Sequence, residues 1–191
     1  WNAVAGFAGA AATAFVGFAA YRLSAQIRQT EEERVIRLTL GSCSNANHEF
    51  NALQKRAHAM HRVSSAGLSW GDFEHLARSR KELSTFSSLE LSEFVIQALY
   101  AGSFPASVTV KISAIVAICA ECERMLHKAA AFERDLDQSN PIDLANFLQF
   151  MGGIDELLRK IIKYVPDVME ALMQAMKERD PNWKEQDVPA P

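Results

Sequence analysis

The residues best suited to chemistry lie in one basic segment, Lys55-Arg56-Ala57-His58-Ala59-Met60-His61-Arg62. His58 and His61 are three residues apart, so they share a face if the segment is helical. Two imidazoles on one face can bind a transition metal when other residues complete the site, with His48 and Glu49 as local options. The same pattern is typical of a solvated basic surface, where neighbouring cations disfavour protonation of the histidines. We expect the basic surface, with a metal site at His58 and His61 as the alternative.

Other sequence patterns give little indication of catalysis. The 191 residues contain no phosphate-binding glycine loop, dinucleotide fingerprint, zinc-protease motif, EF-hand loop or nucleophile elbow. None of the five histidines follows a Glu by three residues, which excludes the Glu-x-x-His pairs of di-iron bundles. Cys119 and Cys122 form a single CxxC inside an apolar helical run, which predicts buried thiols rather than a zinc site. We therefore expect no cofactor, and no small-molecule substrate is evident.

Arg56 and His61 also resemble the Arg-x4–6-His motif of HEPN domains, with four residues between them. HEPN domains are small all-helical domains, and many are metal-independent ribonucleases that form their site across a dimer. The resemblance implies that Arg56 and His61 act at the scissile phosphate of RNA. The sequence departs from the family pattern at Ala57, where a polar residue is usual. On one regular helix a five-residue step also turns the two side chains about 140° apart. RNA is a partner only under this alternative.

Charge is distributed unevenly along the chain. The net charge of −3 shows that the chain as a whole is not a polycation for nucleic acid. Residues 1–21 carry no charge and sixteen of them are hydrophobic, whereas all forty-three Lys, Arg, Asp and Glu residues lie in the other 170. About twenty helical residues cross the hydrocarbon layer, and Trp1 and Tyr21 would lie at its two interfaces. This pattern predicts a single transmembrane helix over residues 1–21.

The residues that follow this apolar segment indicate its orientation. Basic residues after the segment favour the cytoplasmic side, and four of them are Arg22, Arg28, Arg34 and Arg37. A cleaved signal peptide would instead carry its basic residues before the apolar core. Only three cysteines are present, which fits a reducing compartment. We expect a single-pass membrane protein whose main domain is cytoplasmic.

Small residues recur at every fourth position of the apolar segment, at Ala5, Gly9, Thr13 and Gly17. Such rows let helix backbones approach closely in lipid, where packing replaces the hydrophobic effect as the driving force. The row predicts self-association through the membrane helix, although abundant Ala and Gly in a marginal anchor would give a similar pattern. The expected partners are the lipid bilayer and further copies of the chain.

Apolar residues after the segment follow a helical period throughout. The fold class that we expect is all-α, with an N-terminal single transmembrane helix continuing into a cytoplasmic multi-helix bundle. Its expected parts are a transmembrane helix at 1–21, a juxtamembrane helix at 22–40, a bundle at 45–179 and a flexible tail at 180–191.

Several boundaries inside this bundle can be predicted from caps and apolar spacing. Gly41-Ser42 should end the juxtamembrane helix, and Asn45 or Asn47 should cap the next, with an apolar row at Phe50, Leu53, Ala57 and Met60. Further helices are expected over about 71–83, capped by Ser69 or Asp72, over 89–101, capped by Ser87 or Ser88, and over 106–134. Two more should run from Ser139-Asn140-Pro141 onward, with a bend or break at Gly152-Gly153, and from Pro166 onward. The 89–101 helix should bury Leu91, Phe94, Val95, Ala98 and Leu99. The 106–134 helix is the best candidate for the centre of the core.

These features predict an assembly role rather than an enzyme. We expect a membrane-anchored homo-oligomeric scaffold or membrane effector, which in a ring would also provide a pore. The first alternative is a HEPN-like RNA-binding or ribonuclease domain tethered to the membrane. The second is a soluble helical oligomer whose first helix is buried between subunits.

Overall fold

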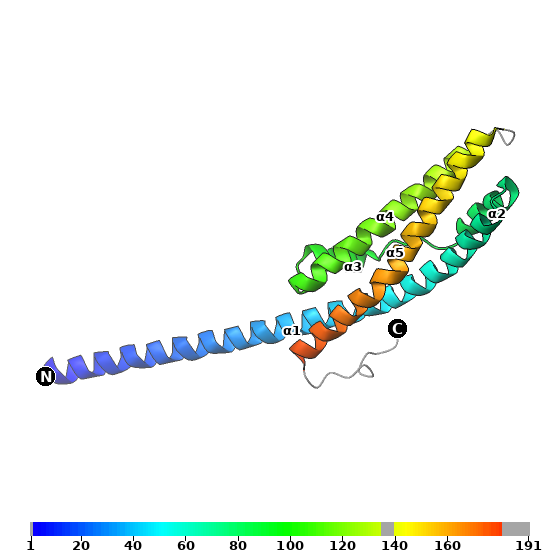
Figure 1. The fold of residues 1–191 in the computed structure, drawn as a ribbon. Helices are drawn as coiled ribbons and strands as arrows, with labels where there is room; N and C mark the ends of the chain where they lie inside the picture. The colour runs from blue at the N-terminus through cyan, green and yellow to red at the C-terminus, as the bar shows by residue number, and fades with distance from the viewer. Residues whose placement is uncertain (1, 135–139, 181–191) are drawn as a thin grey trace. The chain divides into compact units, whose positions relative to one another are not determined.

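The computed structural model describes residues 2–134 and 140–180. For residues 2–17 and 19 it describes the backbone but not the side chains. Within these ranges the chain forms α-helices and short loops, with no strand (Figure 1). The helices are α1 (Asn2–Trp70), α2 (Phe73–Leu83), α3 (Glu93–Tyr100), α4 (Ala106–Arg134) and α5 (Pro141–Arg179). Residues 1–40 and 41–191 form two units, and α1 contributes to both. The all-helical class is confirmed.

Helix α1 is continuous over 69 residues, so the predicted break at Gly41-Ser42 and the new start at Asn45 or Asn47 are wrong. The buried row of α1 begins before this point, at Thr39, and passes it without interruption to Cys43. A glycine in a helix interior costs about 1 kcal/mol relative to alanine. Burial of Ser42 and Cys43, directly after Gly41, offsets this cost.

The core of the second unit is built from apolar rows that advance by alternating steps of three and four residues. Such spacing keeps one stripe of each helix facing its neighbours. In α1 the buried row is Cys43, Ala46, Phe50, Leu53, Ala57 and Met60. In α4 it is Val108, Ile112, Ile115, Cys119, Cys122 and Ala129. The row predicted for residues 50–60 is confirmed, and the 106–134 helix exists with the bounds predicted.

Helices α4 and α5 lie side by side and run in opposite directions (Figure 1). The row that α5 buries includes Phe147, Met151, Ile154, Leu158, Ile161, Val165, Val168 and Leu172. This row runs through the predicted bend at Gly152-Gly153 and through Pro166, which lies inside the helix and does not start it. Both predicted interruptions are therefore wrong. A proline in a helix interior costs about 3 kcal/mol, and here packing at Val165 and Val168 on either side offsets that cost.

Short polar caps set the starts of the remaining helices. The side chains of Asp72, Ser92 and Asn140 accept hydrogen bonds from backbone N–H groups in the first turns of α2, α3 and α5. The caps at Asp72 and Asn140 are among those predicted, but α3 begins later than expected. The Ser88 hydroxyl donates to Glu123 of α4 instead of capping a helix. Phe94, predicted to be buried, is 48% exposed.

The three cysteines are free and buried, as the sequence indicates. Burial raises the pKa of Cys119 and of Cys122 to about 12 from an ordinary value of 9.0. Cys43 follows the same trend, with its pKa raised by burial to about 11. These thiols pack as small apolar groups.

No helix in the described part of the chain contains a stretch that is both long and apolar enough to cross a membrane. The structure gives no support to the transmembrane helix predicted over residues 1–21, most of whose side chains lie outside the described residues. Its row of small residues, Ala5, Gly9, Thr13 and Gly17, belongs to the helical backbone of α1, but the side chains lie outside the described residues. Most of the predicted tail, from residue 181 onward, also lies outside them.

We predict that Gly67→Ala destabilises the bundle where α1 meets α2. A Cβ atom at Gly67 would lie 2.3 Å from Ser79 Oγ and 2.7 Å from Ser79 Cβ. Overpacking of this kind costs about 1–3 kcal/mol. The matched control is Gly152→Ala, because a Cβ there has no neighbour within 4 Å. It should raise the free energy of unfolding by up to about 1 kcal/mol. Urea unfolding of the two variants measures both effects, and equal changes in stability would contradict this packing.

We also predict that the buried thiols resist modification while the bundle is folded. Because the pKa values of Cys119 and Cys122 are raised, the thiolate is scarce at pH 8. Ellman's reagent should therefore label them only as fast as the protein unfolds. The contribution of the protonated thiols to stability is complete below the unfolded pKa, near 9, and declines as the pH rises toward 12. Immediate labelling of all thiols in the native protein would contradict this account.

Candidate functional site

Among the side chains that the structure describes, the most deeply buried charged group is the carboxylate of Asp155, which is 3% exposed on α5. His61 of α1 lies beside it, with Nδ1 2.8 Å from Asp155 Oδ1. Ser65, one turn further along α1, donates from its hydroxyl to the same oxygen at 2.9 Å. Arg159 approaches the second carboxylate oxygen at 2.7 Å. Four polar side chains therefore satisfy one another at the contact between α1 and α5.

The geometry of this cluster differs from that of a catalytic triad. In a triad the carboxylate holds one imidazole nitrogen and the nucleophile contacts the other. Here Ser65 Oγ lies 3.2 Å from Nδ1, the same nitrogen that Asp155 holds. Because a carboxylate oxygen accepts in a hydrogen bond, Nδ1 of His61 is the donor in this pair. The cluster is suited to connecting two helices, not to activating the serine.

Arg56, the other residue of the HEPN-like pair, has different neighbours. Its guanidinium donates from Nη1 to the backbone oxygen of Ser88, in the loop between α2 and α3. Glu123 of α4 holds the same loop by accepting from the backbone N–H of Leu89 at 2.6 Å. Arg56 thus contacts the α2–α3 loop, whereas His61 contacts α5. The structure does not bring the two side chains to a common site for a phosphate.

The predicted metal alternative involves His58 and His61. His58 is exposed, and His61 is engaged with Asp155. Among the residues that the structure describes, no group of three or more His, Cys, Asp or Glu side chains is arranged to hold a metal ion. Within residues 2–134 and 140–180, the histidine pair has no arrangement of further ligands that would complete such a site.

A separate candidate surface lies on α1 before residue 40. Large apolar side chains in this stretch are more than half exposed, namely Phe18, Tyr21, Leu23, Ile27 and Leu38. At 100° per residue, Leu23, Ile27 and Leu38 fall within about 60° of one another around the helix axis. We name these three residues the aliphatic face of α1. Exposed apolar side chains that gather on one face are typical of a binding surface.

The sequence pattern indicated His61 as a candidate site residue but gave no indication of Asp155 or Ser65. The sequence around Asp155 gives only a weak indication of its role. Asp155 directly follows Ile154 of the apolar row of α5, a position at which an acidic residue is typical of the exposed surface. Its contact with His61 joins residues 94 positions apart. Local spacing carries no information on such a pair.

We predict that His61→Ala destabilises the bundle, because it removes a donor from the buried carboxylate of Asp155. The loss of a hydrogen bond to a charged group costs about 1.5–3 kcal/mol. His58→Ala is the matched control, since His58 is exposed on the same helix, and it should change stability by less than about 0.5 kcal/mol. Chemical unfolding with a double-mutant cycle to Asp155→Asn should give a coupling of at least about 0.5 kcal/mol. Additive effects would show that the contact contributes nothing.

Comparison of the chain with protein-family models finds no match, and neither curated proteins nor solved structures give a significant one.

Proposed function

We propose that the chain is a membrane-anchored, homo-oligomeric helical scaffold, assembled through the part of α1 that precedes residue 40. The observation that carries the proposal is the exposure of the aliphatic face, where Leu23 is 59%, Ile27 57% and Leu38 57% exposed. An isolated helix is marginally stable in water, and most helices gain their stability by packing an apolar face. A second copy of the same helix supplies such a surface.

The energetics favour burial of this face. Fully burying a Leu or Ile side chain contributes about 1.5–3 kcal/mol. Three half-exposed aliphatic residues in each copy therefore provide several kcal/mol of driving force, against which the cost of association must be set. Two copies that present equivalent faces form the self-complementary contact that is usual in symmetric oligomers.

Charged residues on the same stretch limit how copies can align. Arg34 falls within the aliphatic face by helical angle, between Leu23 and Ile27. It pairs with Glu31 at 3.8 Å, and Arg37 pairs with Glu33 at the same distance. A charged residue inside an apolar seam costs stability but disfavours other registers. We infer that Arg34 restricts the register in which copies associate.

The membrane anchor in this proposal is the uncharged stretch over residues 1–21, followed by Arg22 and Arg28. Its composition supports insertion with the basic residues on the cytoplasmic side. If every copy is anchored in the same direction, the helices before residue 40 run parallel. The small-residue row would extend the same contact into the lipid.

We predict that Leu23→Glu combined with Ile27→Glu weakens self-association by at least about tenfold, because two buried apolar contacts are replaced by charges. The matched control is Gln26→Glu combined with Gln29→Glu, which adds the same charge on another face of the same exposed stretch. The control should associate nearly as the unsubstituted chain does. Sedimentation equilibrium of full-length protein in mild detergent measures the association constants.

Equal weakening by both pairs of substitutions would show that charge, not the aliphatic face, controls association. Absence of association in the unsubstituted chain would remove the scaffold proposal altogether.

A further inference from the structure

A groove with a volume of about 510 Å³ lies between residues 59–70 of α1 and helix α2. Small-molecule sites typically have volumes of roughly 300–1,000 Å³. The two helices approach closely at Gly67, where no side chain separates α1 from Ser79. The lining combines aromatic and charged side chains, among them Trp70, Arg62 and Arg78.

Trp70 provides a flat aromatic surface at one end of α1. Its indole is 68% exposed, although tryptophan is on average a largely buried residue. The ring stacks on His75 of α2, with centroids 4.7 Å apart and an interplanar angle of 14°. With the imidazole covering one side of the indole, the high exposure leaves room for another planar group to stack on the ring.

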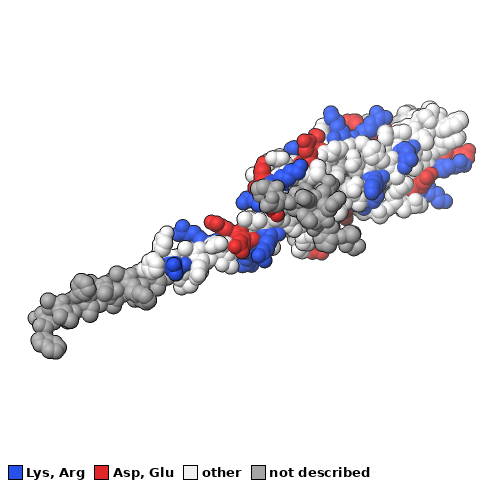
Figure 2. Space-filling model, turned by 90° about the horizontal axis from the view of Figure 1, so that it is seen from below, with Lys and Arg blue, Asp and Glu red and all other residues white. Residues whose placement is uncertain are grey.

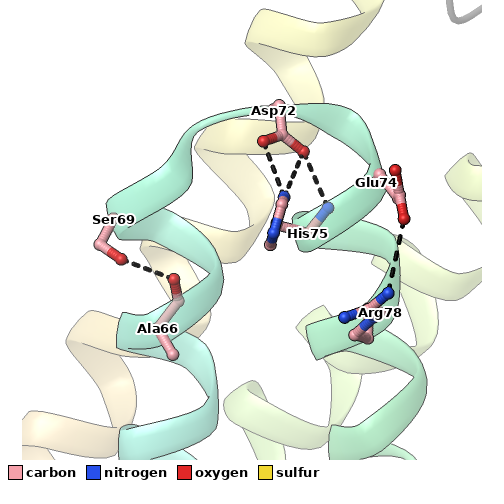
Figure 3. A network of polar contacts seen from close by, with 6 residues as sticks. All are labelled: Ala66, Ser69, Asp72, Glu74, His75 and Arg78. Atoms are coloured by element: carbon pink, nitrogen blue, oxygen red, sulfur yellow. Dashed lines mark hydrogen bonds and ion pairs between the residues drawn. The ribbon is translucent and has the colours of Figure 1, made fainter.

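The position of His75 is fixed by Asp72, the residue that caps α2 (Figure 3). Asp72 accepts from the His75 backbone N–H at 2.9 Å and lies 2.7 and 2.8 Å from ring Nδ1 through its two oxygens. The backbone N–H first, and then the ring, lower the pKa of the Asp72 carboxyl, so it remains ionised at neutral pH. The cap therefore holds His75, which in turn supports Trp70. A surface fixed before binding reduces the entropy cost of ligand capture.

Two arginines supply positive charge in the same groove. The side chain of Arg78 faces Glu74, at 3.4 Å, but both are more than two thirds exposed (Figure 3). Such a surface pair contributes little and can be exchanged for a phosphate, which a guanidinium binds through two parallel hydrogen bonds. Arg62 also lines the groove and is exposed. No Asp or Glu lies within four residues of it along α1.

The charge balance of the groove limits the size of the anion. Arg62, Arg78 and the acidic Glu82 line it and leave one formal positive charge, and Glu74 beside Arg78 reduces the local charge further. On the face that Figure 2 shows, Lys and Arg side chains lie among acidic and uncharged residues and do not form one broad basic surface. One phosphate group fits this local balance better than a triphosphate.

We propose that this groove binds a nucleoside monophosphate unit, with the base stacked on Trp70 and the phosphate held by Arg62 and Arg78. Aromatic side chains stack on any base, and nearby guanidinium groups bind the phosphate, as in other nucleotide and single-strand sites. The unit comes either from a free nucleotide or from a single-stranded nucleic acid. This inference is independent of the scaffold proposal, because the groove lies within the unit that begins at Gly41.

The test is calorimetric titration of the full chain with 5′-AMP, adenosine, inorganic phosphate and a short oligoadenylate. We expect saturable binding of 5′-AMP that is at least about tenfold tighter than that of adenosine or phosphate alone. Trp70→Ala should weaken it about tenfold or more, and Trp70→Phe should weaken it less, since stacking contributes about 1–3 kcal/mol per base. Arg78→Gln should also weaken 5′-AMP binding while leaving adenosine binding unchanged.

Two variants outside the groove serve as controls. Tyr100→Ala removes an aromatic ring that is 86% exposed on α3, and Lys128→Gln removes an exposed cation on α4. Both should bind 5′-AMP as the unsubstituted chain does. Oligoadenylate that binds at least about tenfold tighter than 5′-AMP, still through Trp70, identifies a strand as the source, and equal affinities identify a free nucleotide.

Three results would overturn the proposal. One is the absence of saturable binding of either 5′-AMP or oligoadenylate up to about 10 mM. The second is unchanged affinity in both Trp70→Ala and Arg78→Gln, with folding verified by circular dichroism. The third is an equal loss of affinity in the two control variants, which would indicate binding by general charge and exposed rings.

Discussion

The apolar rows of α1, α4 and α5 advance by three and four residues, and the rest of the second unit depends on this spacing. It keeps each buried stripe in contact with its neighbours over many turns. This packing also keeps α1 and α5 continuous. Gly41 and Pro166 have low helix propensity, and without packing each would favour a helix end at its position. The same packing buries Cys119 and Cys122 as apolar groups and raises the pKa of each thiol.

The rows also decide where the polar side chains go. Ala57 and Met60 are buried in α1, and Arg56 and His61 flank them on either side of the row. Arg56 therefore contacts the loop before α3, while His61 contacts Asp155 on α5. Two residues at a suggestive spacing along the sequence are thus separated by the packed face between them. Their positions are explained by structural contacts within the bundle.

Sequence patterns that depend on local chemistry predicted the structure well. The 106–134 helix and its buried row, the caps at Asp72 and Asn140 and the burial of the cysteines follow from spacing and residue type alone. Predictions failed where a long-range contact overrides a local preference, as at the glycine and proline positions inside α1 and α5. The same limit applies to the sites, because the partner of His61 lies 94 residues away and the groove beside Trp70 exists only where α2 folds back on α1.

The two units differ in how far their apolar side chains are buried. The second unit buries its apolar rows within itself, whereas the helix before residue 40 leaves Leu23, Ile27 and Leu38 more than half exposed. Our account is that further copies of the chain cover this face. The most direct test is the molar mass of the unsubstituted full-length chain, measured by light scattering with and without mild detergent. The account predicts a discrete multiple of the chain mass in detergent and poor recovery without it. A single-chain mass in both conditions would contradict it.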